Sequence, residues 1–381
     1  MSDQRICIVG VGESDFTGNT PDYSALDLQA QASFNALRDA GLERAQVDGL
    51  FTQCGGRMPA ISFAEYLGIR PRFVDSTFVG GASNVMHLDL AAAAIRAGLC
   101  EFALVNYGAT PRQGEYVTLQ PEYADDFDRP FGTCFPVGHY AMCARRHMHQ
   151  YGTRREQFAK LVVESRRWAA LNPRAMRREL VTIDDVLESP PVVAPLHRLD
   201  ACLVSDAGGA FVVTTESRAR DLPCKPVYFL GAGQAYTHRS TALMGDITTS
   251  GAAGSVKCAL RNAGIALDDI DVFEIYDAFS SQLLIMLEDV GLCAKGEGGE
   301  FVASTDFGPG GDVALNTSGG GLSYLHPGMF GIFLIIEAVR QLRGTCGERQ
   351  IPDARTALVQ GNGGVFYSEV TAVLATEGTA L

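Results

Sequence analysis

The chain has 381 residues and a formal net charge of −13, with 46% hydrophobic and 20% charged residues. This composition predicts a globular protein with a large core, built as two domains or as one doubled fold. The acidic balance argues against nucleic acid and anionic membranes as partners. Ten cysteines are scattered singly along the chain, which predicts reduced thiols and no metal site.

The start of the chain leads from Met1 straight into an apolar strand pattern at Ile6. We therefore expect no signal peptide and a cytoplasmic location. No apolar run approaches about 20 residues, so we also expect no transmembrane span.

Short apolar strands alternate with helical patterns, which predicts a layered α/β architecture. In the first half the patterns predict strands over 6–11, 47–51, 72–79, 102–107 and 203–214, and helices over 24–40 and 83–97. Between about 111 and 195 the pattern loosens into an excursion, whose section 140–180 is helical and rich in arginine.

The second half of the chain repeats the first. The segment Ala36-Leu-Arg-Asp-Ala-Gly41 is matched by Ala259-Leu-Arg-Asn-Ala-Gly264, and a strand pattern follows each copy. This predicts a duplicated α/β unit with halves at 1–220 and 221–381. In the duplication, the junction at Gly80-Gly81 corresponds to the junction at His326-Pro327. We therefore expect two helix N-termini to meet at one shared site.

A glycine-rich loop from Asn316 to Gly331 precedes the last apolar helix pattern. Gly319 to Gly321 permit positive φ angles and close backbone approach, and we expect Pro327 to begin the helix. Backbone N–H groups at such a junction can face a developing negative charge, which makes His326 a candidate chemical group. The alternative is a turn whose histidine only caps or fills.

Several ordered motifs resemble those of the thiolase superfamily: Val79-Gly-Gly81 ahead of a helix, Glu274-Ile-Tyr-Asp-Ala-Phe279, and Asn316-Thr-Ser-Gly-Gly320 ahead of His326-Pro-Gly328. Segments 151–158, 172–173, 195–200 and 205–208 are similar to the branch that holds the sterol-carrier-protein thiolases and the lipid-transfer-protein aldolases. The resemblance implies the five-layered α/β/α/β/α thiolase fold, and a coenzyme A thioester as substrate with no bound cofactor. It also implies a homodimer and, in part of the branch, pairing with a small OB-fold, zinc-ribbon protein.

The chain departs from the family pattern at both family cysteines. The position of the nucleophilic cysteine, after the third strand, is Gly81. The loop 359–364, where the family carries an acid/base cysteine, also lacks a thiol. Tyr276 stands where the family has Asn or His, while His326 is retained. The resemblance thus implies groups for an oxyanion without the covalent step of a thiolase.

The remaining groups suit non-covalent carbon–carbon cleavage, in which a base deprotonates a β-hydroxyl and donors hold the thioester enolate. We expect retro-aldol cleavage of a β-hydroxyacyl-CoA, with catalytic groups among His326, Tyr276, Tyr324, Asp277 and Tyr367. We expect Tyr276 or Tyr324 to act as general acid/base, and Asp277 to orient a neighbour or relay a proton. The enolate oxygen would be held by His326 and by backbone N–H groups of Gly80, Gly81, Gly363 and Gly364.

Each of these residues has a structural alternative. The tyrosines can be core aromatics with satisfied hydroxyls, and Asp277 can be a helix N-cap. Two other functions stay open: a thiolase-type acyltransferase with a displaced nucleophile such as Cys54, and a non-catalytic subunit of a hetero-oligomer.

Arginines in the excursion are the candidates for binding the CoA phosphates: the pairs Arg145-Arg146, Arg154-Arg155, Arg166-Arg167 and Arg177-Arg178, with Arg174, and among them above all Arg145, Arg146, Arg154 and Arg155. Guanidinium groups bind phosphate well, and these pairs concentrate positive charge in an acidic chain. The alternative is that basic pairs on helical surfaces serve solubility. Ser83, at the first helix junction, is a further candidate for contact with the substrate, although its hydroxyl is a weak nucleophile without an adjacent base.

Overall fold

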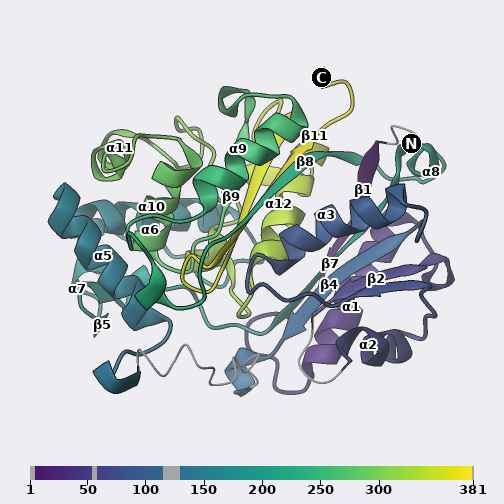
Figure 1. The fold of residues 1–381 in the computed structure, drawn as a ribbon, viewed down its shortest axis with the longest axis horizontal. Helices are drawn as coiled ribbons and strands as arrows, with labels where there is room; N and C mark the ends of the chain where they lie inside the picture. Colours follow the sequence, from purple (N-terminus) through teal and green to yellow (C-terminus); the bar gives the residue numbers. More distant parts are fainter. Residues whose placement is uncertain (1–4, 54–57, 115–128, 380–381) are drawn as a thin grey trace.

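The computed structural model describes residues 5–53, 58–114 and 129–379 (Figure 1). Its main feature is a nine-stranded mixed sheet in the order β3-β2-β4-β7-β1-β8-β11-β10-β9. The strands are β1 (Ile6–Glu13), β2 (Gly49–Thr52), β3 (Phe73–Asp75), β4 (Ala103–Ala109), β7 (Ala207–Thr215), β8 (Val227–Tyr236), β9 (Val272–Ile275), β10 (Thr356–Gly363) and β11 (Ser368–Ala375). A separate two-stranded sheet contains β5 (Pro191–Val193) and β6 (Leu196–His197).

The large sheet consists of two copies of one arrangement. In the first copy, β1 pairs antiparallel with β7, β7 antiparallel with β4, and β4 parallel with β2. In the second copy, β8, β11, β10 and β9 repeat this order with the same directions. Pairing of residues 6–8 with 227–229 joins the copies. The predicted duplication is confirmed in the topology, while the boundary at residue 220 stays a prediction.

Helices lie between the two half-sheets and on their outer faces (Figure 1). The helices α3 (Ser83–Arg96) and α12 (Gly331–Arg343) pack against each other and against strands of both halves. On the outer faces, α1 (Ala25–Ala40) and α2 (Pro59–Leu67) cover the first half, and α9 (Ala252–Ala263) covers the second. The layer order is therefore α/β/α/β/α, as predicted from the sequence.

The repeated hexapeptide of the sequence forms the same helix end in both halves. It supplies the last residues of α1 and of α9, and each helix ends at a glycine in the left-handed conformation, Gly41 with φ +70° and Gly264 with φ +74°. A residue with a Cβ adopts this conformation at a cost, which explains the glycine in both copies. At the other end of α1, Ser24 and Asp27 form a reciprocal capping box.

The excursion between the halves contains α5 (Val137–Tyr151), α6 (Arg155–Leu171) and α7 (Ile183–Glu188). The helical section predicted over 140–180 is broken at Gly152, which ends α5 with φ +75°. Further helices of the chain are α8 (Glu216–Ala219), α10 (Ser280–Val290) and α11 (Gly298–Ser304). Within the described ranges, no helix is long and apolar enough to cross a membrane.

The strand predicted over 203–214 begins later, at Ala207. The N–H groups of Cys202, Leu203 and Ser205 instead bond to carbonyl oxygens of residues 278, 321 and 326 in the second half. This segment therefore runs along the edge of the candidate site rather than in the sheet.

Two further predicted boundaries are wrong. The strand expected over 72–79 ends at Asp75, because the Asp75 carboxylate accepts a hydrogen bond from the Thr77 N–H at 2.8 Å and turns the chain. Pro327 does not begin the last helix, since Gly328 has a φ of +89° and α12 begins at Gly331. His326 consequently lies in an irregular loop, four residues before the helix-capping position.

Candidate active site

Glycine-bearing segments meet backbone to backbone between the two halves. They are Gly80-Gly81 before α3, Gly331 at the start of α12, and Gly363 at the end of β10. A Cβ on Gly331 would lie 2.5 Å from the Gly81 carbonyl oxygen, and a Cβ on Gly80 would lie 2.8 Å from the Gly363 Cα. Only glycine permits such an approach. The N-termini of the two central helices therefore meet, as the duplication predicts.

Tyr276 follows β9 and reaches into this meeting point. Its Oη lies 3.1 Å from Nε2 of His326 and accepts a hydrogen bond from the N–H of Phe330 at 3.2 Å. The N–H of Gly328 donates to His326 Nδ1 at 3.3 Å, so a neutral imidazole carries its proton on Nε2 and donates it to Tyr276. Two N–H donors then occupy the phenol oxygen, and its own O–H is left to donate elsewhere.

The space that Tyr276 fills is the space beside Gly81. A Cβ on Gly81 would overlap the Tyr276 hydroxyl, and it would lie 2.5 Å from Cε2 of that ring and 2.6 Å from the Asn362 carbonyl oxygen. The phenol thus stands where the family pattern has its nucleophilic cysteine. No side chain fits at position 81 while Tyr276 holds this position.

Burial controls the protonation of the Tyr276–His326 pair. It lowers the pKa of His326 to about 4, so the imidazole is neutral at physiological pH. Burial also raises the pKa of Tyr276 well above 10, against the N–H of Phe330, which lowers it. The phenol is therefore protonated at physiological pH.

Asp277 faces the glycine loop rather than a helix start. Its carboxylate accepts hydrogen bonds from the N–H groups of Gly321 at 2.7 Å and Leu322 at 3.3 Å. Burial raises the pKa of Asp277 to about 7 despite these donors. The helix-cap alternative is wrong, because the capping position of α10 is Phe279.

The hydroxyl of Tyr324 points toward a buried ion cluster. It lies beside Glu13, whose carboxylate binds Arg174 at 2.7 Å and Arg340 at 2.6 Å. These contacts tie β1, the excursion and α12 together. Within the described residues, no hydrogen bond joins Tyr324 to Tyr276.

The turn at Gly364 is held by a tyrosine that the sequence patterns did not single out. Tyr140, on α5, donates its hydroxyl to the Gly364 carbonyl at 2.6 Å and accepts a hydrogen bond from the Asn362 side chain at 3.0 Å. Tyr367 packs beside the same turn, where a Cβ on Gly364 would overlap its ring. Its ring centroid lies 5.0 Å from that of His238. Tyr367 is thus a neighbour of the Gly364 turn.

Ser83 closes the turn that precedes α3. Its hydroxyl donates to the Gly80 carbonyl at 2.6 Å and accepts a hydrogen bond from the Val79 N–H at 2.8 Å. The side chain is fully buried. These contacts give Ser83 a structural role, and its contact with substrate stays a prediction.

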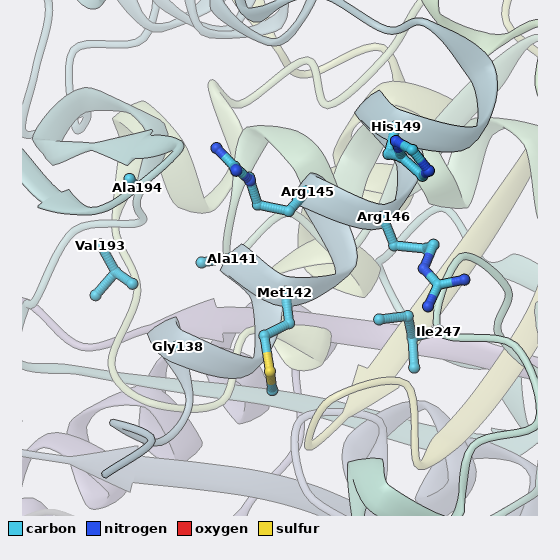
Figure 2. Close-up of a pocket in the computed structure, with 9 residues that line it drawn as sticks. All are labelled: Gly138, Ala141, Met142, Arg145, Arg146, His149, Val193, Ala194 and Ile247. Carbon is cyan, nitrogen blue, oxygen red and sulfur yellow. The ribbon is translucent and has the colours of Figure 1, made fainter. Parts of the chain in front are cut away.

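The arginines predicted to bind CoA phosphates do not gather at one place. Arg145 and Arg146 lie on α5 at a shallow depression of about 510 Å³, together with Val193 of β5 (Figure 2). Arg154 and Arg155 instead lie 3.6 Å and 3.9 Å from carboxylate oxygens of other elements.

A second cavity, of about 310 Å³, carries more positive charge. Four arginines from separate segments line it: Arg112, Arg166, Arg177 and Arg198. Within the described residues, none of the four forms a salt bridge closer than 4.0 Å. Leu322, whose N–H bonds to Asp277, lies in the same lining. The cavity therefore adjoins the candidate site. Arg166 and Arg177 belong to the arginine-rich section that the sequence singled out, whereas Arg112 and Arg198 come from outside it and were not predicted.

Cys202 also lines this second cavity. Burial raises the pKa of its thiol to about 12, so the thiol stays protonated and is a poor nucleophile. Cys54, the displaced nucleophile considered from the sequence, lies outside the described residues. Across the described ranges, no group of three or more His, Cys, Asp or Glu side chains could hold a metal ion.

Comparison with known proteins places the chain in a family. Residues 233–376 match the family model described as "Thiolase C-terminal domain-like". The chain is 36% identical to the "Steroid side-chain-cleaving aldolase" of Thermomonospora curvata, over 94% of this chain and 95% of that protein. It is 34% identical to the "17-hydroxy-3-oxo-4-pregnene-20-carboxyl-CoA lyase" of Mycobacterium tuberculosis, over 91% and 93%.

A solved structure, "Ltp2-ChsH2(DUF35) aldolase", superposes with a TM-score of 0.90 at 32% identity and covers 98% of each chain. The order of layers, the meeting of the two helix N-termini and these relatives agree with one another. The chain belongs to the thiolase superfamily, in the branch that holds the sterol-carrier-protein thiolases and the steroid side-chain-cleaving aldolases.

Proposed function

We propose that this chain cleaves a carbon–carbon bond of a β-hydroxyacyl-CoA by a non-covalent retro-aldol reaction. The observation that carries the proposal is the overlap between Tyr276 and any side chain at Gly81. A covalent acyl-enzyme needs a nucleophilic side chain at the reacting carbon, and this position has none. A phenol stands there instead, with an O–H that can exchange a proton with the substrate.

In the proposed reaction, Tyr276 first gives its phenol proton to the Asp277 carboxylate, and the resulting phenolate takes the proton of the β-hydroxyl. A C=O bond forms there, and the bond between the α- and β-carbons breaks. The electron pair passes to the thioester as an enolate, whose α-carbon takes the proton back from Tyr276. The products are a ketone or aldehyde and a shortened acyl-CoA, and neither an oxidant nor free CoA is consumed.

Tyr276 is the proposed general acid/base. The N–H groups of His326 and Phe330 both point at its oxygen and stabilise its phenolate form. Asp277, with a pKa raised by burial to about 7, is the proposed proton store next to it in the chain. A group with a pKa near ambient pH can both give and take a proton during turnover.

Backbone N–H groups are proposed to hold the enolate oxygen. The N-termini of α3 and α12 meet at the site, and helix N-termini favour a negative charge. The Nε2 of His326 is bonded to Tyr276. We therefore assign His326 to the support of Tyr276, and the enolate oxygen to the Gly80-Gly81 and Gly363-Gly364 turns. Each such donor contributes about 3–4 kcal/mol.

The four-arginine cavity is the proposed site for the phosphate groups of the CoA thioester. Glu179 also lines the cavity and lies near Arg166 and Arg177, but four guanidinium groups outnumber this one carboxylate and attract phosphate. The cavity adjoins Asp277 through Leu322. This assignment keeps Arg166 and Arg177 of the arginines predicted from the sequence, whereas Arg145 and Arg146 line a different depression. A thioester that starts at the arginines and passes Leu322 would place its acyl end near Tyr276.

A homodimer and a small partner are proposed as the assembly. β3 is an edge strand, and near it Val74 and Phe78 are 37% and 44% exposed. An exposed edge with apolar side chains is normally covered by another chain. The name of the solved Ltp2 aldolase includes a second protein, ChsH2(DUF35), and we propose a small OB-fold, zinc-ribbon protein as partner of this chain. We also propose a cytoplasmic location, since CoA thioesters are intracellular metabolites.

The test has two arms. One uses 17-hydroxy-3-oxo-4-pregnene-20-carboxyl-CoA, the compound in the name of the Mycobacterium tuberculosis lyase, and the other uses a β-ketoacyl-CoA with free CoA. We expect the first to yield a 17-ketone and propionyl-CoA, and the second to yield no thiolysis product. Thiolysis of the β-ketoacyl-CoA without cleavage of the hydroxyacyl-CoA would contradict the proposal.

A further inference from the structure

Tyr107, in β4, sits behind the loop that carries His326. Its side chain is fully buried, and its hydroxyl donates to the Pro327 carbonyl oxygen at 2.6 Å. The same hydroxyl interacts with the backbone N–H of Met329. These two contacts bracket Gly328, which has a φ of +89°. A strand of the first half thus holds a loop of the second half at one glycine.

The peptide group between Pro327 and Gly328 is hydrogen-bonded at both ends. Its carbonyl accepts from Tyr107, and its N–H donates to Nδ1 of His326 at 3.3 Å. A trans peptide is planar, so its C=O and N–H point in opposite directions. Because Tyr107 fixes the direction of the carbonyl, it also fixes the direction of the N–H.

This peptide determines which ring nitrogen of His326 carries the proton. While Nδ1 accepts from Gly328, the hydrogen stays on Nε2 and points at Tyr276. If the peptide turned over, Nδ1 would face a carbonyl and would carry the proton instead. Nε2 would then accept a hydrogen bond from the Tyr276 hydroxyl, and His326 could no longer stabilise the phenolate form of Tyr276.

We propose that Tyr107 is a positioning residue, which sets the tautomer of His326 through the Pro327–Gly328 peptide. Tyr107 touches no reacting atom, and it acts on Tyr276 only through His326. The kinetic consequence rests on the proposed retro-aldol function. The tautomer does not, because it can be measured without turnover.

The test compares Tyr107→Phe with Tyr228→Phe. Tyr228 is also buried, and its hydroxyl meets Oε1 of Glu216 at 3.3 Å, remote in the chain from the His326 loop. In proteins labelled with ¹⁵N-histidine, we expect the Nε2–H form of His326 in the wild type and in Y228F. In Y107F we expect the Nδ1–H form or a mixture of the two.

The kinetic arm uses the same proteins. Misplacement of a group by about 1 Å can cost about a hundredfold in rate. We expect Y107F to lose between about tenfold and about a hundredfold in kcat with an unchanged KM, which marks an interaction used in the transition state. Y228F should keep both constants.

The His326 signals are assigned by their absence in His326→Gln. If Y107F does not fold, 4-fluorophenylalanine at position 107 fills the space of the hydroxyl without donating a hydrogen bond. A folded variant that keeps the Nε2–H form overturns the proposal. A changed tautomer with full kcat supports the control of the tautomer by Tyr107 and overturns its kinetic consequence. If the wild type cleaves no β-hydroxyacyl-CoA, the retro-aldol function fails by itself and the spectra alone decide the role of Tyr107.

Discussion

The hydroxyl of Tyr276 and the absent side chain of Gly81 occupy the same space. A thiolase-type site needs a side chain at position 81 to attack a carbonyl carbon, whereas this site needs that side chain to be missing. The two positions are therefore coupled, because the phenol can occupy this space only while position 81 has no side chain. In the proposed mechanism, the acid/base group takes the place of the nucleophile.

The first prediction concerns Gly81→Ala. The added methyl group would overlap the Tyr276 phenol and lie 2.6 Å from the Asn362 carbonyl, so Tyr276 must move. We expect a loss of about 1–3 kcal/mol in the free energy of unfolding, measured with urea, and a loss of retro-aldol turnover.

The matched control is Gly254→Ala, in α9, where an added Cβ meets nothing within 4 Å. We expect this variant to be more stable by about 0.5–1 kcal/mol, because alanine is the better helix former. Full turnover and unchanged stability in Gly81→Ala would show that the overlap is not real.

The second prediction distinguishes Tyr276 from Tyr324, which the sequence left as alternative general acid/base groups. Tyr276→Phe removes the O–H at the site, and we expect kcat to fall by about 10²–10⁴ with acyl-CoA binding retained. Tyr324→Phe removes a hydroxyl that lies beside Glu13, and we expect it to keep most of its turnover. Steady-state kinetics with the same substrate measure both, and the reverse ranking would refute the assignment.

The third prediction follows from the pKa of Asp277, which burial raises from 3.8 to about 7. Between these values the folded protein holds a proton that the unfolded chain has lost. Rising pH therefore lowers the free energy of unfolding by about 1.4 kcal/mol per unit in this window. The variant Asp277→Asn lacks this titration.

Urea unfolding of both proteins at several pH values provides the measurement. The stability of Asp277→Asn relative to the wild type should rise from about pH 4 to about pH 7 and then level off. Parallel pH dependences in the two proteins would mean that Asp277 titrates at its ordinary pKa and does not store a proton at neutral pH.

The fourth prediction compares two sets of arginines. Arg177→Ala and Arg198→Ala each remove a guanidinium from the four-arginine cavity, and we expect KM for an acyl-CoA to rise by about tenfold with kcat unchanged. Arg145→Ala and Arg146→Ala, at the depression on α5, should leave KM unaltered. An increase in KM confined to Arg145→Ala and Arg146→Ala would place the phosphate site at the α5 depression instead.

The duplicated fold was predictable because both halves carry the same short sequence motifs. The hexapeptides that end at Gly41 and Gly264 form the same helix end in both halves, and left-handed glycine caps depend on local sequence alone. The central position of α12 was also readable, since residues 332–336 are apolar without interruption and are all buried. Helix starts were less predictable. Pro327 predicted the start of α12, but the positive φ of Gly328 is not helical, and α12 begins only at Gly331.

The site was predictable only in part, because hydrogen bonds between distant segments leave no local pattern. Tyr276, Asp277 and His326 stood in recognisable motifs, and the structure brings them together around the glycine turns. Tyr140 meets Gly364 across 224 residues, and Tyr107 meets Pro327 across 220. Their hydroxyls have no sequence signal that distinguishes them from core aromatics.

Intact-protein mass spectrometry during turnover of a β-hydroxyacyl-CoA tests the central claim most directly. If Tyr276 acts as the acid/base group and no nucleophile stands at Gly81, the ketone and the shortened acyl-CoA accumulate while the mass of the protein stays unchanged. A mass increase equal to an acyl group, on any side chain and formed during turnover, would contradict the non-covalent mechanism.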